Sequence, residues 1–322
     1  MTTLLRSTLR ATLALAALCI AAPWSTASFA QDAWPTKPVH LVVPFSPGGS
    51  TDVIGRMLAQ KLAEMWGQSV IIDNRPGAGG NSGADLVAKS PGDGYTLLLA
   101  SGSITINPHI YKHMPFDTKK DLVPITDVAS GPMLVVVPYD SPAKNIKDLI
   151  AMAKAKPGTV NFGSAGVGSQ VHLAGENFAN AAKIDIVHVP YKGEAPAYTD
   201  LIGHFAAASA LLGPGRLRAL AVTGKERSPL LPDVPTAAES GLPGFENTGW
   251  FGLFAPVGTP QAVLEKIQHD TVKALASTDI KARLYVQGMS PVGNTPAEFA
   301  KAMDQESSHW AAVVKSRKLS VN

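Results

Sequence analysis

One short stretch does most to define the fold class: Pro44-Phe45-Ser46-Pro47-Gly48-Gly49-Ser50-Thr51-Asp52, residues 44–52. It follows an apolar run at residues 39–43, which is typical of a buried strand. It leads into residues 51–65, where apolar side chains recur at the spacing of one helical face. A strand, a glycine-rich turn and a helix in this order are the start of an α/β unit.

The same order of elements recurs along the chain. The next elements are a strand at 70–73, a glycine-rich turn at 75–80, a helix near 82–89 and a strand at 95–100. After residue 130 the pattern restarts, with strands at 133–137, 160–162, 186–189 and 217–222, and helices at 145–156, 169–180 and 196–202. Beyond residue 243 we expect a strand around 250–255 and two long helices, which begin at Thr259-Pro260 and at a capping box of Thr295 and Glu298.

This alternation predicts an α/β protein with mostly parallel sheets flanked by helices. Because the pattern restarts and the chain then returns, we expect two lobes with a ligand cleft between them. One lobe would contain residues 31–131 and 246–322, and the other residues 132–245.

The first thirty residues have the pattern of a secretory signal. Arg6 and Arg10 precede an apolar run at 11–22, and small residues follow up to Ser28-Phe29-Ala30. The apolar run is shorter than the roughly 20 residues of a membrane-spanning helix. We therefore expect cleavage after Ala30 and a periplasmic protein. The only cysteine, Cys19, lies in this signal, so the mature chain would use neither disulfides nor thiol catalysis.

Composition excludes two further classes of protein. Hydrophobic residues make up 45% of the chain and charged residues 16%, which is not the composition of a disordered chain. The formal charge is +3 and no basic stripe is visible, so we expect no nucleic-acid partner.

Motifs of common enzymes are missing or incomplete in this sequence. Residues 48–52 resemble a nucleophile elbow but end in Asp instead of Gly, and no P-loop is present. Residues 77–82 do not complete a dinucleotide fingerprint. His109 and His113 have the spacing of helical metal ligands, but prolines flank them and no acid lies between them. We expect no metal and no cofactor.

Two glycine-rich loops are candidates for ligand binding. Besides residues 44–52, the segment Gly163-Ser164-Ala165-Gly166-Val167-Gly168-Ser169 lies between a predicted strand and a predicted helix. Each loop leads into a helix N-terminus, where backbone N–H groups lack partners and the helix dipole attracts carboxylate or phosphate. One loop in each lobe would grip an anion from both sides.

The same residues also have plain structural explanations. Ser50, Thr51 and Ser169 are good helix caps with or without a ligand. Asp52 could receive an ammonium or hydroxyl group of a ligand, or it could simply be favoured in the first turn of a helix. Lys192 could add positive charge to the cleft or lie on the solvated surface.

Several ordered motifs resemble the Bug family, the extracytoplasmic solute receptors of tripartite tricarboxylate transporters. They are Trp34-Pro35-Thr36-Lys37-Pro38, residues 44–52, Asn74-Arg75-Pro76-Gly77-Ala78-Gly79-Gly80, Gly163-Ser164-Ala165-Gly166, Val189-Pro190-Tyr191-Lys192-Gly193, residues 217–223 and residues 231–236. The resemblance covers the mature chain. It implies a two-lobed periplasmic receptor that closes over a small carboxylate, without catalysis or cofactor. It also implies a monomer whose partners are the membrane components of such a transporter.

The resemblance also implies which residues line the cleft. In the first lobe and at the end of its third strand they are Phe45, Gly48, Gly49, Thr51, Asp52 and Ser101. In the second lobe they are Ser164, Ala165, Gly166, Ser169, His172 and Tyr191.

The sequence departs from the family pattern at one place. The interval 204–216 is several residues short and lacks the acid that the family usually carries near the ligand. Two alternatives therefore stay open. One is a folded family member that binds no ligand. The other is an exported hydrolase of small esters or amides, with His172 or Ser169 at its centre, since distance in sequence does not exclude a spatial triad.

Overall fold

The computed structural model describes residues 34–198, 212–213, 217–317 and 319–320. Contacts divide the chain into Met1–Trp34 and a second unit, Pro35–Asn322, which the following paragraphs describe. The predicted signal at residues 1–30 lies outside the described residues, and so does the interval 204–216 apart from Leu212 and Gly213. No helix of the described part is long and apolar enough to cross a membrane.

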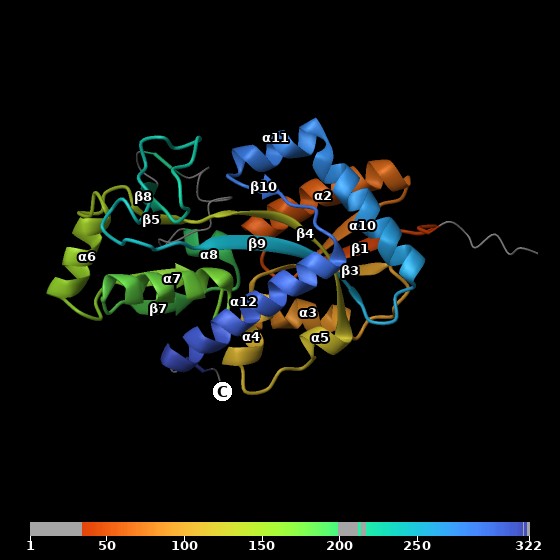
Figure 1. Ribbon diagram of the computed structural model, residues 1–322, viewed down its shortest axis with the longest axis horizontal. Coiled ribbons are helices and arrows are strands. Elements are labelled where there is room, and N and C mark those ends of the chain that lie inside the picture. Colours follow the sequence, from red (N-terminus) through yellow and green to blue (C-terminus); the bar gives the residue numbers. More distant parts are fainter. Residues whose placement is uncertain (1–33, 199–211, 214–216, 318, 321–322) are drawn as a thin grey trace, which may run out of the picture. The chain divides into compact units, whose positions relative to one another are not determined.

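A six-stranded sheet forms the centre of the second unit (Figure 1). Its strands, in spatial order, are β10 (Ser290–Pro291), β4 (Leu122–Pro132), β9 (Thr248–Pro256), β3 (Thr96–Ser101), β1 (Val39–Val43) and β2 (Val70–Asn74). Strands β1 to β4 run in one direction, and β9 and β10 run against them. The sheet is therefore mixed, with most strands parallel in direction, as the alternation of elements predicted.

Helices cover both faces of this sheet. They are α2 (Ser50–Trp66), α3 (Asn81–Ala88) with the short η1 (Ala78–Gly80), α4 (Ser103–Ile110), α5 (Thr118–Asp121), α10 (Gln261–Ala276), α11 (Thr278–Val286) and α12 (Pro296–Arg317). The capping box is confirmed, because the backbone N–H of Glu298 donates to Thr295 Oγ1 and that of Thr295 to Glu298 Oε2. The helix that follows the third strand was not predicted from the sequence. Helix α4 continues through Pro108 because it buries Ile104, Ile106 and Ile110.

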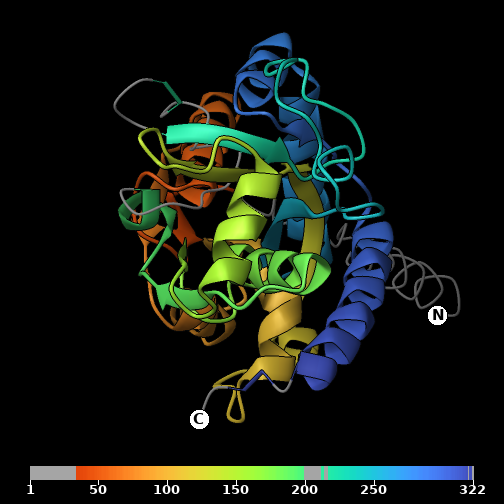
Figure 2. The ribbon, with the colours of Figure 1, turned by 90° about the vertical axis from the view of Figure 1, so that its left-hand side faces the viewer.

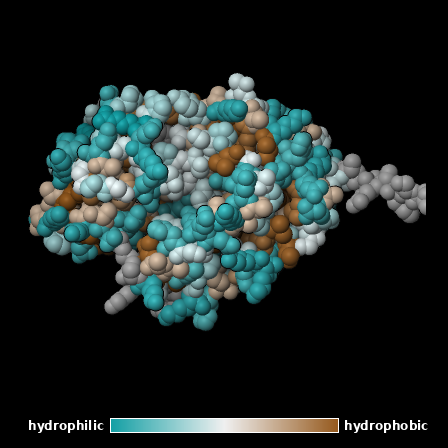
Figure 3. All heavy atoms as spheres, viewed as in Figure 1, coloured by the Kyte–Doolittle hydropathy of each residue, from teal (hydrophilic) through white to brown (hydrophobic). Residues whose placement is uncertain are grey.

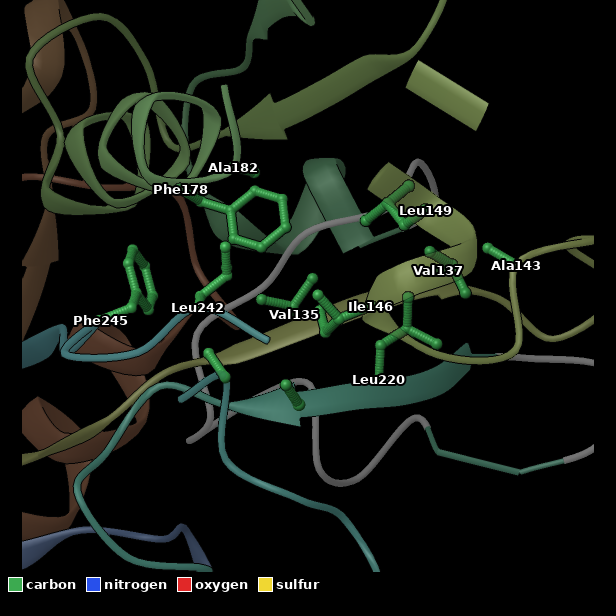
Figure 4. Close-up of a cluster of buried hydrophobic side chains, with 12 residues drawn as sticks. Val135, Val137, Ala143, Ile146, Leu149, Phe178, Ala182, Leu220, Leu242 and Phe245 are labelled. Atoms are coloured by element: carbon green, nitrogen blue, oxygen red, sulfur yellow. The ribbon is translucent and has the colours of Figure 1, made fainter. Parts of the chain in front are cut away.

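The elements between residues 133 and 245 build two further small sheets. Strand β5 (Leu134–Pro138) pairs antiparallel with β8 (Leu217–Val222), and β6 (Asn161–Ser164) pairs parallel with β7 (Val187–Pro190). Helices α6 (Ile146–Ala155) and α7 (Gln170–Ala182) pack beside the β5–β8 pair, and α8 (Glu194–Tyr198) follows β7 (Figure 2). Their shared core contains Val135, Ile146, Phe178, Leu220 and Phe245 (Figure 4).

Two long strands connect these small sheets to the central one. Strand β4 leads directly into β5, and β9 begins just after the segment that follows β8 (Figure 1). The six-stranded sheet thus uses residues on both sides of 132–245, while the small sheets lie within that range. The two-lobe division stays a prediction. The face seen in Figure 3 is mostly hydrophilic, with scattered hydrophobic patches.

Candidate functional site

The first glycine-rich loop connects β1 to α2. Gly48 has a φ of +85°, a backbone conformation that glycine adopts without strain. Helix α2 begins at Ser50. Its cap residue is Gly49, which has no side chain that could accept hydrogen bonds from the first N–H groups of the helix. A distant carboxylate does so instead. The backbone N–H and the hydroxyl of Ser50 both donate to Glu194 Oε2, at 2.8 and 2.6 Å.

Asp52, which we considered for contact with a ligand, is engaged within the protein. It accepts hydrogen bonds from the backbone N–H of Gly48 at 2.9 Å, from Asn74 at 3.0 Å and from Arg56 at 2.9 and 3.0 Å. Burial by itself raises the pKa of Asp52. The donors from Arg56, Gly48 and Asn74 outweigh that effect, so the pKa lies below its usual value. Asp52 fixes the shape of the loop and does not line the cavity described below.

The second glycine-rich loop leads from β6 into α7. Gly166 and Gly168 have φ values of +116° and +82°. Ser169 is the N-cap of α7, and its Oγ accepts from the backbone N–H of His172 at 3.2 Å. His172 Nδ1 in turn accepts from the backbone N–H of Gly168 at 3.2 Å. His172 therefore supports this loop from behind.

Two histidines stack beneath the second loop. The rings of His172 and His188 lie 3.9 Å apart, and Phe162 stacks on His188 at 5.0 Å. Burial, with a smaller contribution from the neighbouring His188, lowers the pKa of His172 to about 3. Burial also lowers the pKa of His188 to about 4. Both imidazoles are neutral at pH 7. Glu176 does not reverse this, since its carboxylate lies 3.8 Å from His172 Nε2, beyond hydrogen-bond range.

The two loops meet at a small buried cavity with about 10 Å³ of free space. The N-termini of both α2 and α7 contribute to its wall. Its lining residues are Phe45, Gly49, Ser50, Thr51, Ser101, Ala165, Ser169, Gln170, Val171 and Glu194. Such a volume holds no more than about one water molecule.

A wider cleft of about 660 Å³ adjoins this cavity through Ala165. It contains two more of the predicted residues, Gly166 and Tyr191, together with Lys192. The loop of Gly77, Ala78 and Gly79 forms its opposite wall. A larger groove of about 730 Å³, between α4, α5 and α12, contains none of the predicted binding residues.

The predicted binding residues thus fall into three groups. Phe45, Gly49, Thr51, Ser101, Ala165 and Ser169 line the small cavity, and Ala165, Gly166 and Tyr191 line the wider cleft. Gly48, Asp52, Ser164 and His172 line neither and support the two loops. Sequence reasoning missed Gln170, Val171 and Glu194 and regarded Ser50 only as a cap. The position of Glu194, directly after the Tyr191-Lys192-Gly193 motif, was a signal that could have been used.

The arrangement does not favour hydrolysis at the two residues considered for it. Ser169 contacts the backbone of His172, not its imidazole. Ser164 Oγ does lie 2.6 Å from His188 Nε2, but Ser164 is fully buried and outside both cavities. Among the described residues, no group of three or more His, Cys, Asp or Glu is placed to hold a metal ion.

Fold and site together are those of a binding protein, in which two helix N-termini and two glycine-rich loops meet at a small cavity. Residues 54–319 match the family model described as the tripartite tricarboxylate transporter family receptor, TctC. The chain belongs to this family, which confirms the resemblance to Bug proteins.

Individual relatives agree over nearly their whole length. BugT of Bordetella pertussis is 38% identical over 313 residues, which are 94% of this chain and 96% of BugT. The solved structure of R. palustris Rpa4515 with adipate is 37% identical, with a TM-score of 0.86 over 89% of this chain and 99% of Rpa4515. The structure of MatC from Rhodopseudomonas palustris with bound malate is 30% identical, with a TM-score of 0.80 over 87% of this chain and all of MatC.

Proposed function

We propose that this protein captures a small carboxylate in the periplasm for a tripartite tricarboxylate-type uptake system. One observation carries the proposal: the N-termini of α2 and α7 lie in the wall of one cavity, in a chain of the receptor family. Helix N-termini attract anions through their N–H groups and dipoles. Two solved relatives hold dicarboxylates, adipate and malate.

The cavity also indicates how the ligand enters. Its free space of about 10 Å³ is far too small for a dicarboxylate, so the two glycine-rich loops must separate before a ligand binds. Hinge motion of two lobes is the usual way in which such receptors open. We therefore propose capture by lobe closure, without catalysis, in a monomer that delivers its ligand to membrane components of the transporter.

Export is the first step of this function. We propose that the signal at residues 1–30 directs the chain to the periplasm and is removed after Ala30. N-terminal sequencing of protein recovered from the periplasm should begin at Gln31. Protein that keeps Met1 would contradict this step.

Ligand binding is tested by thermal unfolding of residues 31–322 with a panel of acids. The panel contains succinate, malate, adipate, citrate, aspartate, glutamate, nicotinate and an aromatic acid. A ligand at 100 times its Kd stabilises the folded state by about 2.7 kcal/mol, which raises Tm by several degrees. No shift with any acid would contradict the proposal.

A matched pair of variants tests whether the ligand binds in the small cavity. Thr51→Val removes a cavity-lining hydroxyl and keeps the shape of the side chain, so it should weaken binding several-fold. Thr271→Val makes the same change in α10, where Thr271 Oγ1 is buried and has no hydrogen-bond partner among the described residues, and should leave affinity unchanged. Equal affinities in the two variants would place the ligand elsewhere.

A further inference from the structure

The carboxyl group of Glu194 lies in the wall of the small cavity in which we propose that the ligand binds. Its Oε2 accepts the backbone N–H of Ser50 at 2.8 Å and the Ser50 hydroxyl at 2.6 Å. The hydroxyl of Tyr198 donates to the same oxygen at 2.7 Å. Glu194 is only 6% exposed, and its side chain packs against Gly49, the cap residue of α2.

This contact joins two distant parts of the chain. Ser50 begins α2 beside the central sheet, whereas Glu194 begins α8, 144 positions later. Glu194 lies close to the cap residue of α2, since a Cβ at Gly49 would meet Glu194 Cβ at 3.4 Å, an ordinary van der Waals distance. Helix α2 has no cap from its own side chains, so Glu194 supplies the negative charge that its N-terminus favours.

A ligand carboxylate at the N-terminus of α2 needs the same donors. Since Glu194 Oε2 already accepts both donors of Ser50 and little free space remains in the cavity, both carboxylates cannot bind there at once. Two like charges side by side in a buried site are also unfavourable.

We infer that Glu194 is an internal competitor for the ligand, a carboxylate of the chain that holds the α2 N-terminus until a ligand carboxylate displaces it. The inference rests on the proposed carboxylate binding. Glu194 thereby lowers the affinity of the site for any acid whose carboxylate needs the α2 N-terminus. Tyr198 is a positioning residue, since it holds Glu194 in place and does not line the cavity.

The test compares the affinities of three variants and the wild type for the best acid of the panel by calorimetry. Glu194→Gln keeps the size of the side chain and removes its charge. Charge-assisted hydrogen bonds are about twice as strong as neutral ones, so the ligand should bind about tenfold more tightly to this variant. Tyr198→Phe removes one hydrogen bond to Glu194 and leaves its charge, and it should tighten binding about threefold. Thr271→Val serves as the control and should equal the wild type.

Each outcome has a distinct meaning. Equal or weaker binding by Glu194→Gln would show that Glu194 does not compete, and it would overturn the inference while the proposed function stands. Tighter binding by Glu194→Gln with no change in Tyr198→Phe would show long-range repulsion without displacement, and it would also overturn the inference. Binding of no acid by the wild type or by either variant would overturn the proposed function itself, and the competition with it.

Discussion

Lowering the pH should destabilise this protein through the stacked histidines His172 and His188. Both have a pKa near 6.5 in an unfolded chain, but about 3 and about 4 in the folded protein. As pH falls below 6.5, the unfolded chain takes up protons that the folded protein refuses. The stability that these groups contribute is therefore complete above pH 6.5 and is lost progressively as the pH falls, toward 4 for His188 and toward 3 for His172.

The size of this effect follows from the two pKa values. At pH 5 the solution is 1.5 pH units below the unfolded pKa and still above both folded values. Each pKa unit corresponds to 1.36 kcal/mol, so each histidine costs about 2 kcal/mol at pH 5 relative to pH 7.5. The buried carboxyl groups of Asp127 and Glu306 act in the opposite direction, because burial raises their pKa. A difference between variants is therefore more informative than the wild-type profile alone.

The assay is urea unfolding of ligand-free protein at pH 7.5, 6.5, 5.5 and 5. His188→Gln removes one titrating ring and keeps a hydrogen-bonding partner for Ser164 Oγ. Between pH 7.5 and 5 the wild type should lose about 2 kcal/mol more stability than this variant. The same change at the exposed His113 is the control, and its profile should run parallel to that of the wild type. A profile of His188→Gln that also runs parallel to the wild type would refute the reasoning.

Three further predictions concern one glycine and two buried carboxyl groups. Gly79→Ala should reduce the free energy of ligand binding by more than it reduces the free energy of unfolding, because a Cβ at Gly79 would collide with the carbonyl oxygen of Val167. Gly67→Ala, at the same left-handed φ but in open space, should cost only about 1 kcal/mol of stability and no affinity; calorimetry and urea unfolding of both variants test this. Asp127→Asn should stabilise the protein by a few kcal/mol at pH 8 and progressively less toward pH 5, because burial raises the pKa of Asp127 to about 7; a constant difference between the two unfolding profiles would contradict it. Asp52→Ala should lower stability by about 1–3 kcal/mol at pH 7, since three partners lose their acceptor, and urea unfolding with an unchanged midpoint would show that these bonds contribute little.

Local patterns in the sequence predicted much of the fold. The strands at 39–43 and 217–222 have the predicted bounds, because each is a short apolar run between turn residues. Asn145 caps α6 at the predicted start of this helix, accepting from the N–H of Asp148 at 2.9 Å. These features depend on neighbours in sequence, which a single chain displays directly.

Elements that depend on distant partners were missed. Strand β4 contains prolines, serine and threonine, so its sequence does not resemble a strand. Its pairing with β9 also has two irregularities of register. Its pairing with β9, more than 100 positions away, holds it in the sheet. Helix α4 contains Pro108, which favours a turn locally, and burial against its neighbours outweighs that preference.

The candidate site shows the same division between local and distant interactions. The two glycine-rich loops were recognised because their composition indicates a turn before a helix. Asp52, the acid nearest to the first loop, was the obvious candidate for a ligand contact, yet Arg56 at the next turn of the helix binds it. The acid that does reach the α2 N-terminus is Glu194, and its place after the Tyr191-Lys192-Gly193 motif does not by itself indicate a partner 144 positions away.

There is a physical reason why Glu194, and not Asp52, binds the N-terminus of α2. An uncapped helix N-terminus buried in a cavity needs an anionic or polar partner at all times, because unpaired N–H groups are costly away from water. Asp52 cannot serve, since the groups of Arg56, Gly48 and Asn74 already hold its oxygens. Without a ligand the chain must therefore provide another acceptor, and Glu194 meets this need from 144 positions further along the chain. A receptor built in this way binds its ligand by exchanging one carboxylate for another, so its affinity reflects the difference between two similar interactions and not the full strength of either.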